Sequence, residues 1–313
     1  MSQADEGNSF AIQTTSISRT FGDLTAVDGI DLNVEHGELF SLLGPNGAGK
    51  TTTIKMLCCL LKPTGGTATI MGHDIQKDPL SVKSVIDVSP QETAIAERLN
   101  AWENLTLMAG LHGLDKQAAR ERSGELLEMM ALDGRAKEKV KNYSGGMKRR
   151  LSIAMALVSD PQVLFLDEPT LGLDPQSRRA IWEHIEHLKG EKTVVLTTHY
   201  LEEADALADR VAIIDEGKIV ALGTPKDLKE SIAGDQVLVV EAALTDDAVD
   251  ALRKLYPVVR RTESGVEIEG EAANIYDIQD VLRPRGITID STFKKQTTLD
   301  DVFLRLTGKQ LRE

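Results

Sequence analysis

The 313-residue sequence contains only two cysteines and no long apolar run. Cys58 and Cys59 are adjacent in a predicted helix behind a glycine-rich loop, so we expect them to fill core rather than form a disulfide, with the cytosol as the natural compartment. The longest purely apolar runs, such as 56–61, have about six residues, whereas a helix needs roughly 20 to cross a bilayer. We therefore expect no membrane-spanning segment, and a transport function would need a membrane pathway from another polypeptide.

Basic residues are also in deficit. The 36 lysines and arginines are outnumbered by 49 acids, which are scattered along the chain and give a net charge of −13. This balance argues against a nucleic-acid-binding surface, so no nucleic-acid partner is expected. A salt-rich habitat would explain the charge equally well. Residues 1–8 are polar and acidic, without the apolar core of an export signal. The length suffices for one large domain and a small second one.

One segment combines a glycine-rich loop, a lysine and two hydroxyls within nine residues. These are Gly44, Pro45, Asn46, Gly47, Ala48, Gly49, Lys50, Thr51 and Thr52. A predicted buried strand, 38–43, precedes the loop and a predicted helix follows it, which is the context that a phosphate-binding loop requires. The glycines let successive backbone N–H groups point inward, and the start of the helix adds its positive end.

This segment predicts a nucleoside triphosphate site. Lys50 would reach the β- and γ-phosphates, Thr51 would supply one ligand of an octahedral Mg²⁺, and Thr52 would contact the α-phosphate side. A glycine-rich turn without a ligand is the alternative, and it is disfavoured because every fixed position of the motif is filled.

A second apolar run, 163–168, ends in Asp167 and Glu168. Such a run predicts a buried strand that delivers charge to a crevice at its carboxyl end. Asp167 would hold Mg²⁺ through water. Glu168, which would point to the opposite side of the extended chain, could act as general base on an attacking water.

A third motif, Ser144-Gly145-Gly146, opens a predicted helix that runs to about residue 158. Serine is a good N-cap, and glycine allows close approach of the backbone, so a γ-phosphate could be bound here by hydroxyl, amides and helix dipole together. Standing alone, the motif could equally serve as a local helix cap.

With these motifs, residues of about 10–225 resemble the nucleotide-binding subunits of ATP-binding cassette (ABC) proteins. The resemblance also rests on Gln91 in the segment 89–92, on Asp174 in the segment 171–174 and on His199 after an apolar run. Two positions depart from the usual pattern: Phe21 stands where the family usually has an adenine-stacking tyrosine, and Met147 where it often has glutamine. Phenylalanine can still stack on a base.

The resemblance implies an ATPase in which two copies pair head to tail. The Ser144-Gly145-Gly146 corner of one copy would then close over the triphosphate held by Lys50 of the other. Gln91 would contact the metal and report closure, Asp174 would bridge the copies, and His199 would fix the γ-phosphate and the water. Without the other motifs, His199 would be interpreted as the end of a buried strand.

The predicted fold class is α/β. It consists of an ABC-type P-loop ATPase core with an antiparallel edge over about 12–34, which turns at Gly22-Asp23, and with a helical subdomain over about 95–158. A boundary near Gly234 separates a domain 10–233 from a C-terminal domain 236–313. The order βαββαβ in the second domain indicates a ferredoxin-like α+β fold. Its predicted elements are strands at 236–241 and 288–294, a hairpin over 258–269, helices at 246–255 and 274–282, and a capped helix ending at Gly308.

The sequence therefore predicts the ATP-binding, Mg²⁺-dependent subunit of an ABC exporter. It would act as a homodimer on separate integral membrane permease subunits at the cytoplasmic face of the membrane. The end of the chain resembles that of ATPase subunits of drug-resistance, antibiotic-export and sodium-efflux systems. Trp102, after Gln91, is a candidate anchor for the membrane partner, although a tryptophan at helical spacing is more often core. The alternative is a soluble ABC ATPase that remodels a ribosome, DNA or a protein complex.

Overall fold

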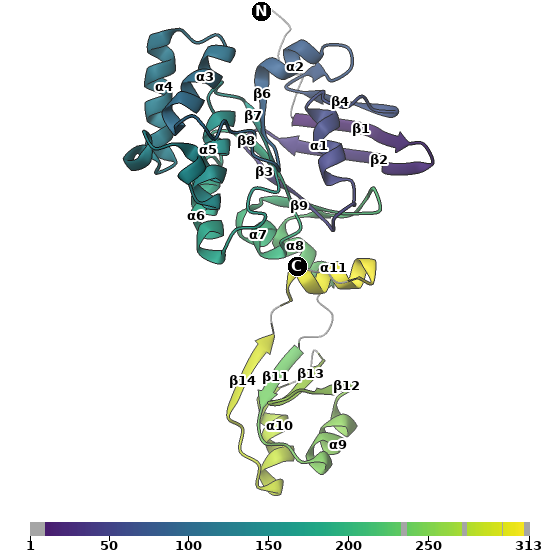
Figure 1. Cartoon of the computed structure of the whole chain (residues 1–313). Coiled ribbons are helices and arrows are strands. Elements are labelled where there is room, and N and C mark those ends of the chain that lie inside the picture. The colour runs from purple at the N-terminus through teal and green to yellow at the C-terminus, as the bar shows by residue number, and fades with distance from the viewer. Residues whose placement is uncertain (1–9, 233–236, 271–273, 296, 310–313) are drawn as a thin grey trace, which may run out of the picture. The chain divides into compact units, whose positions relative to one another are not determined.

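The computed structural model describes residues 10–232, 237–270, 274–295 and 297–309 (Figure 1). Its first fifteen elements are β1 (Phe10–Phe21), β2 (Leu24–Glu35), β3 (Leu39–Leu43), α1 (Lys50–Leu57), β4 (Gly65–Ile70), β5 (His73–Asp74), α2 (Pro79–Val85), β6 (Ile86–Ser89), α3 (Ala101–Leu111), α4 (Lys116–Met129), two 3₁₀ turns η1 (Asp133–Arg135) and η2 (Val140–Asn142), α5 (Gly145–Ala156), β7 (Val163–Asp167) and α6 (Pro175–Glu186). They are followed by β8 (Thr193–Thr198), α7 (Leu201–Leu207), β9 (Arg210–Asp215), β10 (Lys218–Gly223) and α8 (Pro225–Ile232).

Two compact units can be separated among the described residues. One comprises 10–225 with 306–309, and the other lies between Lys226 and Arg305. The predicted domain limits at 233 and 236 fall outside the described residues, as does Gly234. The division into 10–233 and 236–313 therefore stays a prediction.

A six-stranded sheet in the order β10-β9-β3-β8-β7-β6 forms the centre of the first unit. All neighbours are parallel except β10, which runs antiparallel to β9. Every residue of β3, β7 and β8 is buried, as the uninterrupted apolar runs predict for parallel strands covered on both faces. The register pairs Leu43 with Thr198 and Asp167 with Thr197, so the loops after these strands meet at one edge of the sheet.

The antiparallel edge predicted over about 12–34 is confirmed as a second sheet in the order β2-β1-β4-β5. Gly22, with a φ of 56°, makes the predicted turn between β1 and β2. Ile54 of α1 shares one apolar core with Ile12 of this sheet and Phe40 of the central sheet. That core fixes α1, and with it the loop before α1, against both sheets.

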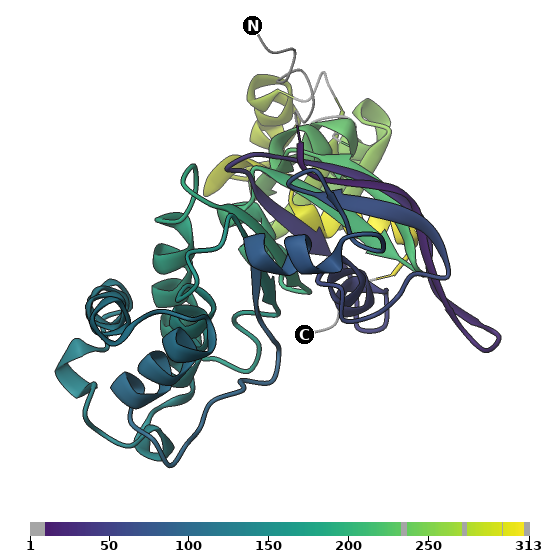
Figure 2. The same ribbon diagram turned by 90° about the horizontal axis from the view of Figure 1, so that it is seen from above.

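The predicted helical subdomain contains α3, α4, η1 and η2, here called the helical insert, and α5. Figures 1 and 2 show α3 and α4 on the opposite side of the central sheet from the antiparallel sheet. Asn100 caps α3 through a reciprocal pair of hydrogen bonds with Glu103, and Asp115 caps α4. Within the described residues, no helix combines the length and apolar character needed to cross a membrane.

The prediction that Cys58 and Cys59 lie within a helix is wrong, because α1 ends at Leu57. Cys59 has a φ of 55°, and the N–H groups of Cys59 and Leu60 bond back to the carbonyls of Met56 and Lys55. This is a Schellman C-cap with cysteine where glycine is usual. Both thiols are free, and Cys58 is buried in the core as expected.

The second unit contains β11 (Val237–Glu241), α9 (Asp246–Leu255), β12 (Val258–Arg261), β13 (Gly265–Glu269), α10 (Ile275–Leu282), a 3₁₀ turn η3 (Arg283–Arg285) and β14 (Ser291–Lys295), and α11 (Leu299–Thr307) ends the described elements. The antiparallel order β12-β13-β11-β14 is the ferredoxin-like arrangement predicted from the sequence. The last strand begins at Ser291 rather than 288, because its partner β11 ends at Glu241, opposite Ser291. Position 236 of the predicted first strand lies outside the described residues.

Candidate active site at the carboxyl edge of the central sheet

The glycine-rich loop joins β3 to α1, as predicted. Gly47 and Gly49 have φ values of 84° and 105°, which other residues rarely adopt. A Cβ atom on Gly49 would lie 2.4 Å from the carbonyl oxygen of Ala26, and one on Gly44 would lie 2.2 Å from that of Ile214. Both obstacles are backbone atoms of neighbouring strands, so the loop keeps its place only with glycine at these positions.

A cavity of about 350 Å³ opens over this loop. Nine predicted site residues line it: Pro45, Asn46, Gly47, Gly49, Lys50, Thr51, Thr52, Gln91 and Glu168. Gln91 reaches the cavity because β6 ends at Ser89 beside the end of β7. The topology of the sheet thus brings together residues that lie more than a hundred positions apart.

Lys50 is the first residue of α1 and is only 5% exposed. Its ammonium donates to the carbonyl oxygens of Gly44 at 2.6 Å and Pro45 at 3.2 Å. It also pairs with Oε1 of Glu168 at 3.0 Å, and that carboxylate is equally buried. A phosphate arriving in the cavity would compete with Glu168 for this cation.

Thr51 and Asp167 adjoin, as the prediction of a shared metal requires. The Thr51 hydroxyl donates to Oδ1 of Asp167 at 3.0 Å, and the Thr197 hydroxyl donates to the same oxygen at 2.6 Å. A hydroxyl, a carboxylate and the amide of Gln91 are the oxygen donors that Mg²⁺ takes, with substrate phosphate completing its shell. The residues present therefore fit a magnesium ion.

Glu168 differs from the prediction in its orientation. The strand ends at Asp167, and Glu168 has a φ of 49°, so the two acids are not on opposite sides of an extended chain. Instead Asp167 faces Thr51 and Glu168 faces Lys50, its neighbour in α1. Left-handed backbone at a non-glycine residue costs about 1–3 kcal/mol and is held only where the surroundings enforce it.

His199 follows β8 directly, and its Nδ1 lies 2.8 Å from Oε2 of Glu168. The Glu168 carboxylate is therefore held at both oxygens, by Lys50 on one and His199 on the other. A carboxylate fixed in this way would present a defined orientation to a water entering the cavity, which general-base chemistry requires.

Nine predicted site residues are not part of the lining of the cavity among the described residues. Four of them adjoin lining residues, namely Gly44, Ala48, Asp167 and His199, and the other five are Phe21, Ser144, Gly145, Gly146 and Asp174. Ser144 caps α5, as predicted, by accepting from the N–H of Met147 at 3.3 Å. Gly146 lies against the start of α6, where a Cβ atom would come 3.1 Å from the Ser177 hydroxyl. Asp174 caps α6, and the hydrogen bonds from Ser177 lower the pKa of this carboxyl. The Ser-Gly-Gly corner and Asp174 thus lie at adjoining helix starts.

Phe21 is the last residue of β1 and is 45% exposed. The guanidinium of Arg19 lies 4.4 Å from the centre of its ring. The aromatic ring is thereby supported on one side by a cation and remains accessible, as a stacking surface must be.

Three residues around the site were not assigned a role from the sequence. Thr197 accepts from the N–H of Glu168 at 2.9 Å, and Glu203 on α7 accepts from the Thr170 hydroxyl at 2.8 Å. Arg149 on α5 is buried, and desolvation lowers its pKa to about 10. Threonine within an apolar strand and arginine inside an apolar-periodic helix were the available signals.

Comparison with known proteins agrees with this geometry. A model of the ABC transporter family matches residues 27–171. The chain is 42% identical over 311 residues to the daunorubicin/doxorubicin resistance ATP-binding protein DrrA of Streptomyces peucetius, covering 95% of this chain and 92% of that protein. It is 39% identical over 307 residues to Nod factor export ATP-binding protein I of Paraburkholderia xenovorans (strain LB400), covering 97% of this chain and 99% of that protein.

Among solved structures, the chain resembles the dimeric post-hydrolysis state of the ATP-binding cassette MJ0796 bound to ADP and Pi. The TM-score is 0.62 at 27% identity, over 68% of this chain and 98% of that chain. Three findings agree: the sequence is similar to two relatives over nearly their whole length, the fold is that of a solved cassette, and a phosphate-binding loop lies beside Glu168 at one edge of the sheet. The chain belongs to the ABC transporter family, as one of its ATP-binding ATPase subunits.

Proposed function

We propose that this chain hydrolyses Mg²⁺-ATP as a homodimer and thereby drives export through separate integral membrane permease subunits. The observation that carries the proposal is the contact chain Lys50–Glu168–His199, with distances of 3.0 and 2.8 Å, whose first two members line the cavity. These contacts place the Lys50 ammonium, which can bind phosphate, beside a Glu168 carboxylate that is fixed at both oxygens. The relatives named for drug resistance and Nod factor export supply the direction of transport.

Glu168 is the proposed general base. When the triphosphate enters, its phosphates take Lys50 as a partner, and the carboxylate that Lys50 releases stays fixed by His199. The base is then free to orient water towards the γ-phosphate. Magnesium held by Thr51, Asp167 and Gln91 would neutralise charge on the phosphates. Phosphoryl transfer needs mainly such positioning and charge stabilisation from a protein.

The rest of the site would come from a second copy. The Ser144-Gly145-Gly146 corner has the capped helix start and the close backbone of an anion site, yet it is not part of the lining of its own cavity. A head-to-tail dimer would bring it to the partner's triphosphate, and a solved cassette that the chain resembles is dimeric. Asp174, beside this corner, would then lie at the same interface, and Phe21 would stack on the adenine.

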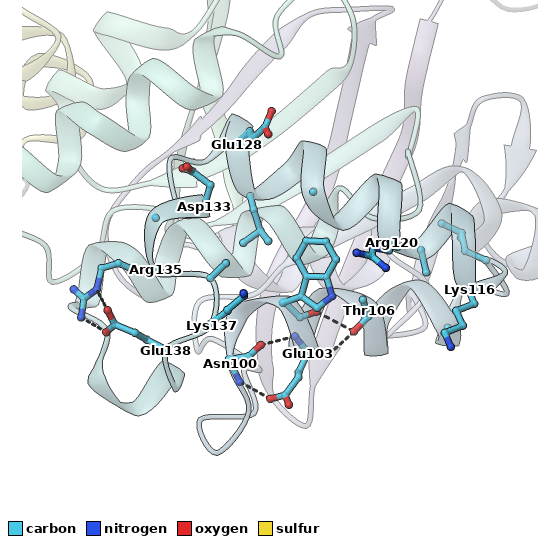
Figure 3. Close-up of a pocket in the computed structure, with 18 residues that line it drawn as sticks. Asn100, Glu103, Thr106, Lys116, Arg120, Glu128, Asp133, Arg135, Lys137 and Glu138 are labelled. Atoms are coloured by element: carbon cyan, nitrogen blue, oxygen red, sulfur yellow. Dashed lines mark hydrogen bonds and ion pairs between the residues drawn. The ribbon is translucent and has the colours of Figure 1, made fainter.

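The membrane partner is proposed to contact the helical insert. A groove of about 1120 Å³ lies between α3, α4 and the segment that follows them (Figure 3). Trp102 lines it and is half-buried, with its ring against Gly124 of α4. The loop from Gln91 into α3 is fixed where the Asn104 side chain bonds both backbone groups of Ala96. Contact at this groove would be transmitted to Gln91 at the cavity.

Domain limits of 10–233 and 236–313, and a peripheral location at the cytoplasmic face of the membrane, are part of the same proposal. The test is affinity purification of the full chain from membranes of its own organism, followed by identification of what is bound. We expect an integral membrane protein to copurify, and Trp102→Ala to reduce its recovery.

Leu111→Ala is the matched control, since this exposed residue of α3 is not part of the lining of the groove. Recovery of ribosomes or of a soluble complex, with no integral protein, would favour the remodelling alternative. The homodimer is tested separately: ATPase activity per chain should rise with chain concentration, and activity independent of concentration would contradict a composite site.

A further inference from the structure

Arg149 makes contacts that the proposed mechanism does not use. It lies in the second turn of α5, is 5% exposed, and directs its guanidinium to backbone carbonyls of two other segments. Because all its acceptors are main-chain atoms, no other side chain in these segments determines the interaction. An arginine fork is suited to hold several carbonyls at once, whereas a lysine ammonium is a single point charge.

The first set of contacts surrounds Glu168. Nη2 of Arg149 donates to the carbonyl oxygen of Asp167 at 2.7 Å, and Nε donates to that of Pro169 at 2.8 Å. These are the residues immediately before and after Glu168. One edge of the guanidinium therefore clamps the left-handed turn that aims Glu168 at Lys50.

The second set of contacts holds the loop of Gln91. Nη1 of Arg149 donates to the carbonyl oxygen of Pro90 at 2.6 Å and lies 3.5 Å from that of Gln91. A single side chain thus joins the loop after β6 to the turn after β7. Both segments bear predicted ligands or bases of the same cavity.

The helix that carries Arg149 begins at the Ser-Gly-Gly corner. Arg149 lies five positions after Ser144, which is about 7.5 Å along a helix. We propose that Arg149 is a positioning residue that holds Glu168 in its active orientation and couples the Gln91 loop to the Ser-Gly-Gly corner. The nucleotide cavity of one chain and the surface it offers to its partner then move together. The coupling part of this inference rests on the proposed homodimer.

Arg149→Lys in the full-length chain tests the inference, with Arg150→Lys as the matched control. Arg150 follows in the same helix and also bonds backbone carbonyls, but those of Met130 and Ala131 in the helical insert. For Arg149→Lys we expect the Kd of a fluorescent ATP analogue to stay within about twofold of wild type. We expect kcat to fall about tenfold, with KM little changed.

Dimer closure is measured in the background of Glu168→Gln, by sedimentation with Mg²⁺-ATP. Adding Arg149→Lys should weaken ATP-driven dimerisation about tenfold, and adding Arg150→Lys should not. Equal kcat and equal dimerisation for the two lysine variants would overturn the inference. A parallel fall of nucleotide affinity, kcat and melting temperature would also overturn it, because that pattern reports general loss of structure.

Failure of the dimer itself is distinguishable from failure of the coupling. If Glu168→Gln alone forms no ATP-driven dimer, the proposed homodimer is wrong, whereas the kcat comparison still judges whether Arg149 positions Glu168. If the Arg149 variants do not fold, hydrogen exchange can be measured instead on a chain that keeps Arg149. In Glu168→Gln, amides of 89–92 and of the first turn of α5 should gain protection at the same ATP concentration. If the two segments gain protection at different ATP concentrations, the proposed coupling is contradicted.

Discussion

Glu168→Gln perturbs the proposed general base while preserving its shape. In the structure, the Glu168 carboxylate contacts the Lys50 ammonium at 3.0 Å and His199 at 2.8 Å, and Glu168 is only 5% exposed to solvent. The amide keeps an oxygen but loses the negative charge and the proton affinity. Two effects follow, one on turnover and one on nucleotide affinity, and they have opposite signs.

The effect on turnover follows from the loss of the proposed base. General-base catalysis contributes about 10²–10⁴ in rate, so we expect kcat to fall by about a thousandfold. The effect on affinity follows from the competition for Lys50. A hydrogen bond to a charged group contributes about 1.5–3 kcal/mol, and an amide oxygen retains about half of that. Losing about 1 kcal/mol from the competing contact should tighten ATP binding about fivefold.

Both effects can be measured on one preparation. Titration with a fluorescent ATP analogue gives the Kd, and phosphate release under single-turnover conditions gives the rate of chemistry. Glu38→Gln is the matched control, because Glu38 is also a buried glutamate but lies at the other end of β3, bonded to the backbone of Glu35. Unchanged turnover in Glu168→Gln would refute the assignment of the base, and weaker ATP binding would refute the competition for Lys50.

Three further predictions concern other parts of the chain. Lys50→Ala should remove high-affinity ATP binding, which nucleotide titration measures; binding within a factor of about ten of wild type would contradict its role at the phosphates. Burial raises the pKa of the Glu203 carboxyl in the folded chain, and this effect outweighs the hydrogen bonds from neighbouring side chains, which lower the pKa. The stability that this carboxyl contributes is therefore present below its unfolded pKa of 4.5 and is lost as the pH rises through the folded pKa. Urea unfolding should therefore show Glu203→Gln gaining stability relative to wild type as the pH rises above about 4.5, and a difference that does not change with pH would argue against this. We propose a dimer-stabilising or regulatory role for the C-terminal domain, so deletion of 236–313 should alter dimerisation, complex assembly or the ATPase rate; if all three stay the same, the domain has neither role.

The sequence predicted the elements whose signals are local. Apolar runs identified β3, β7 and β8, and the helix 246–255 was predicted with the bounds that α9 has. The boundaries that differ depend on a partner or on a cap. The end of α1 is set by the left-handed Cys59, a residue with no turn signal, and the start of β14 is set by where β11 ends. Neither can be read from the residues concerned.

The same division holds for the candidate site. Motifs named the residues, and the parallel order of β3, β8, β7 and β6 explains why Lys50, Glu168 and Gln91 line one cavity. The orientation of Glu168 was predicted wrongly, because it depends on backbone that leaves the strand directly after Asp167. Hydrogen bonds with Arg149 of α5 and Thr197 of β8 hold that turn. Sequence spacing contains no information about such contacts between distant elements.

The arrangement of α5 supports the proposal that one copy alone is not the working unit. Its first turn, at the Ser-Gly-Gly corner, is the proposed anion site and is not part of the lining of its own cavity, while Arg149 in its second turn bonds the backbone on both sides of Glu168. A helix is stiff over this distance, so a phosphate pulling on the first turn would act on the second. If a partner's triphosphate docks at the corner, the force reaches the base of the opposite site through Arg149. Hydrolysis and dimer closure would then be coupled through the first two turns of α5.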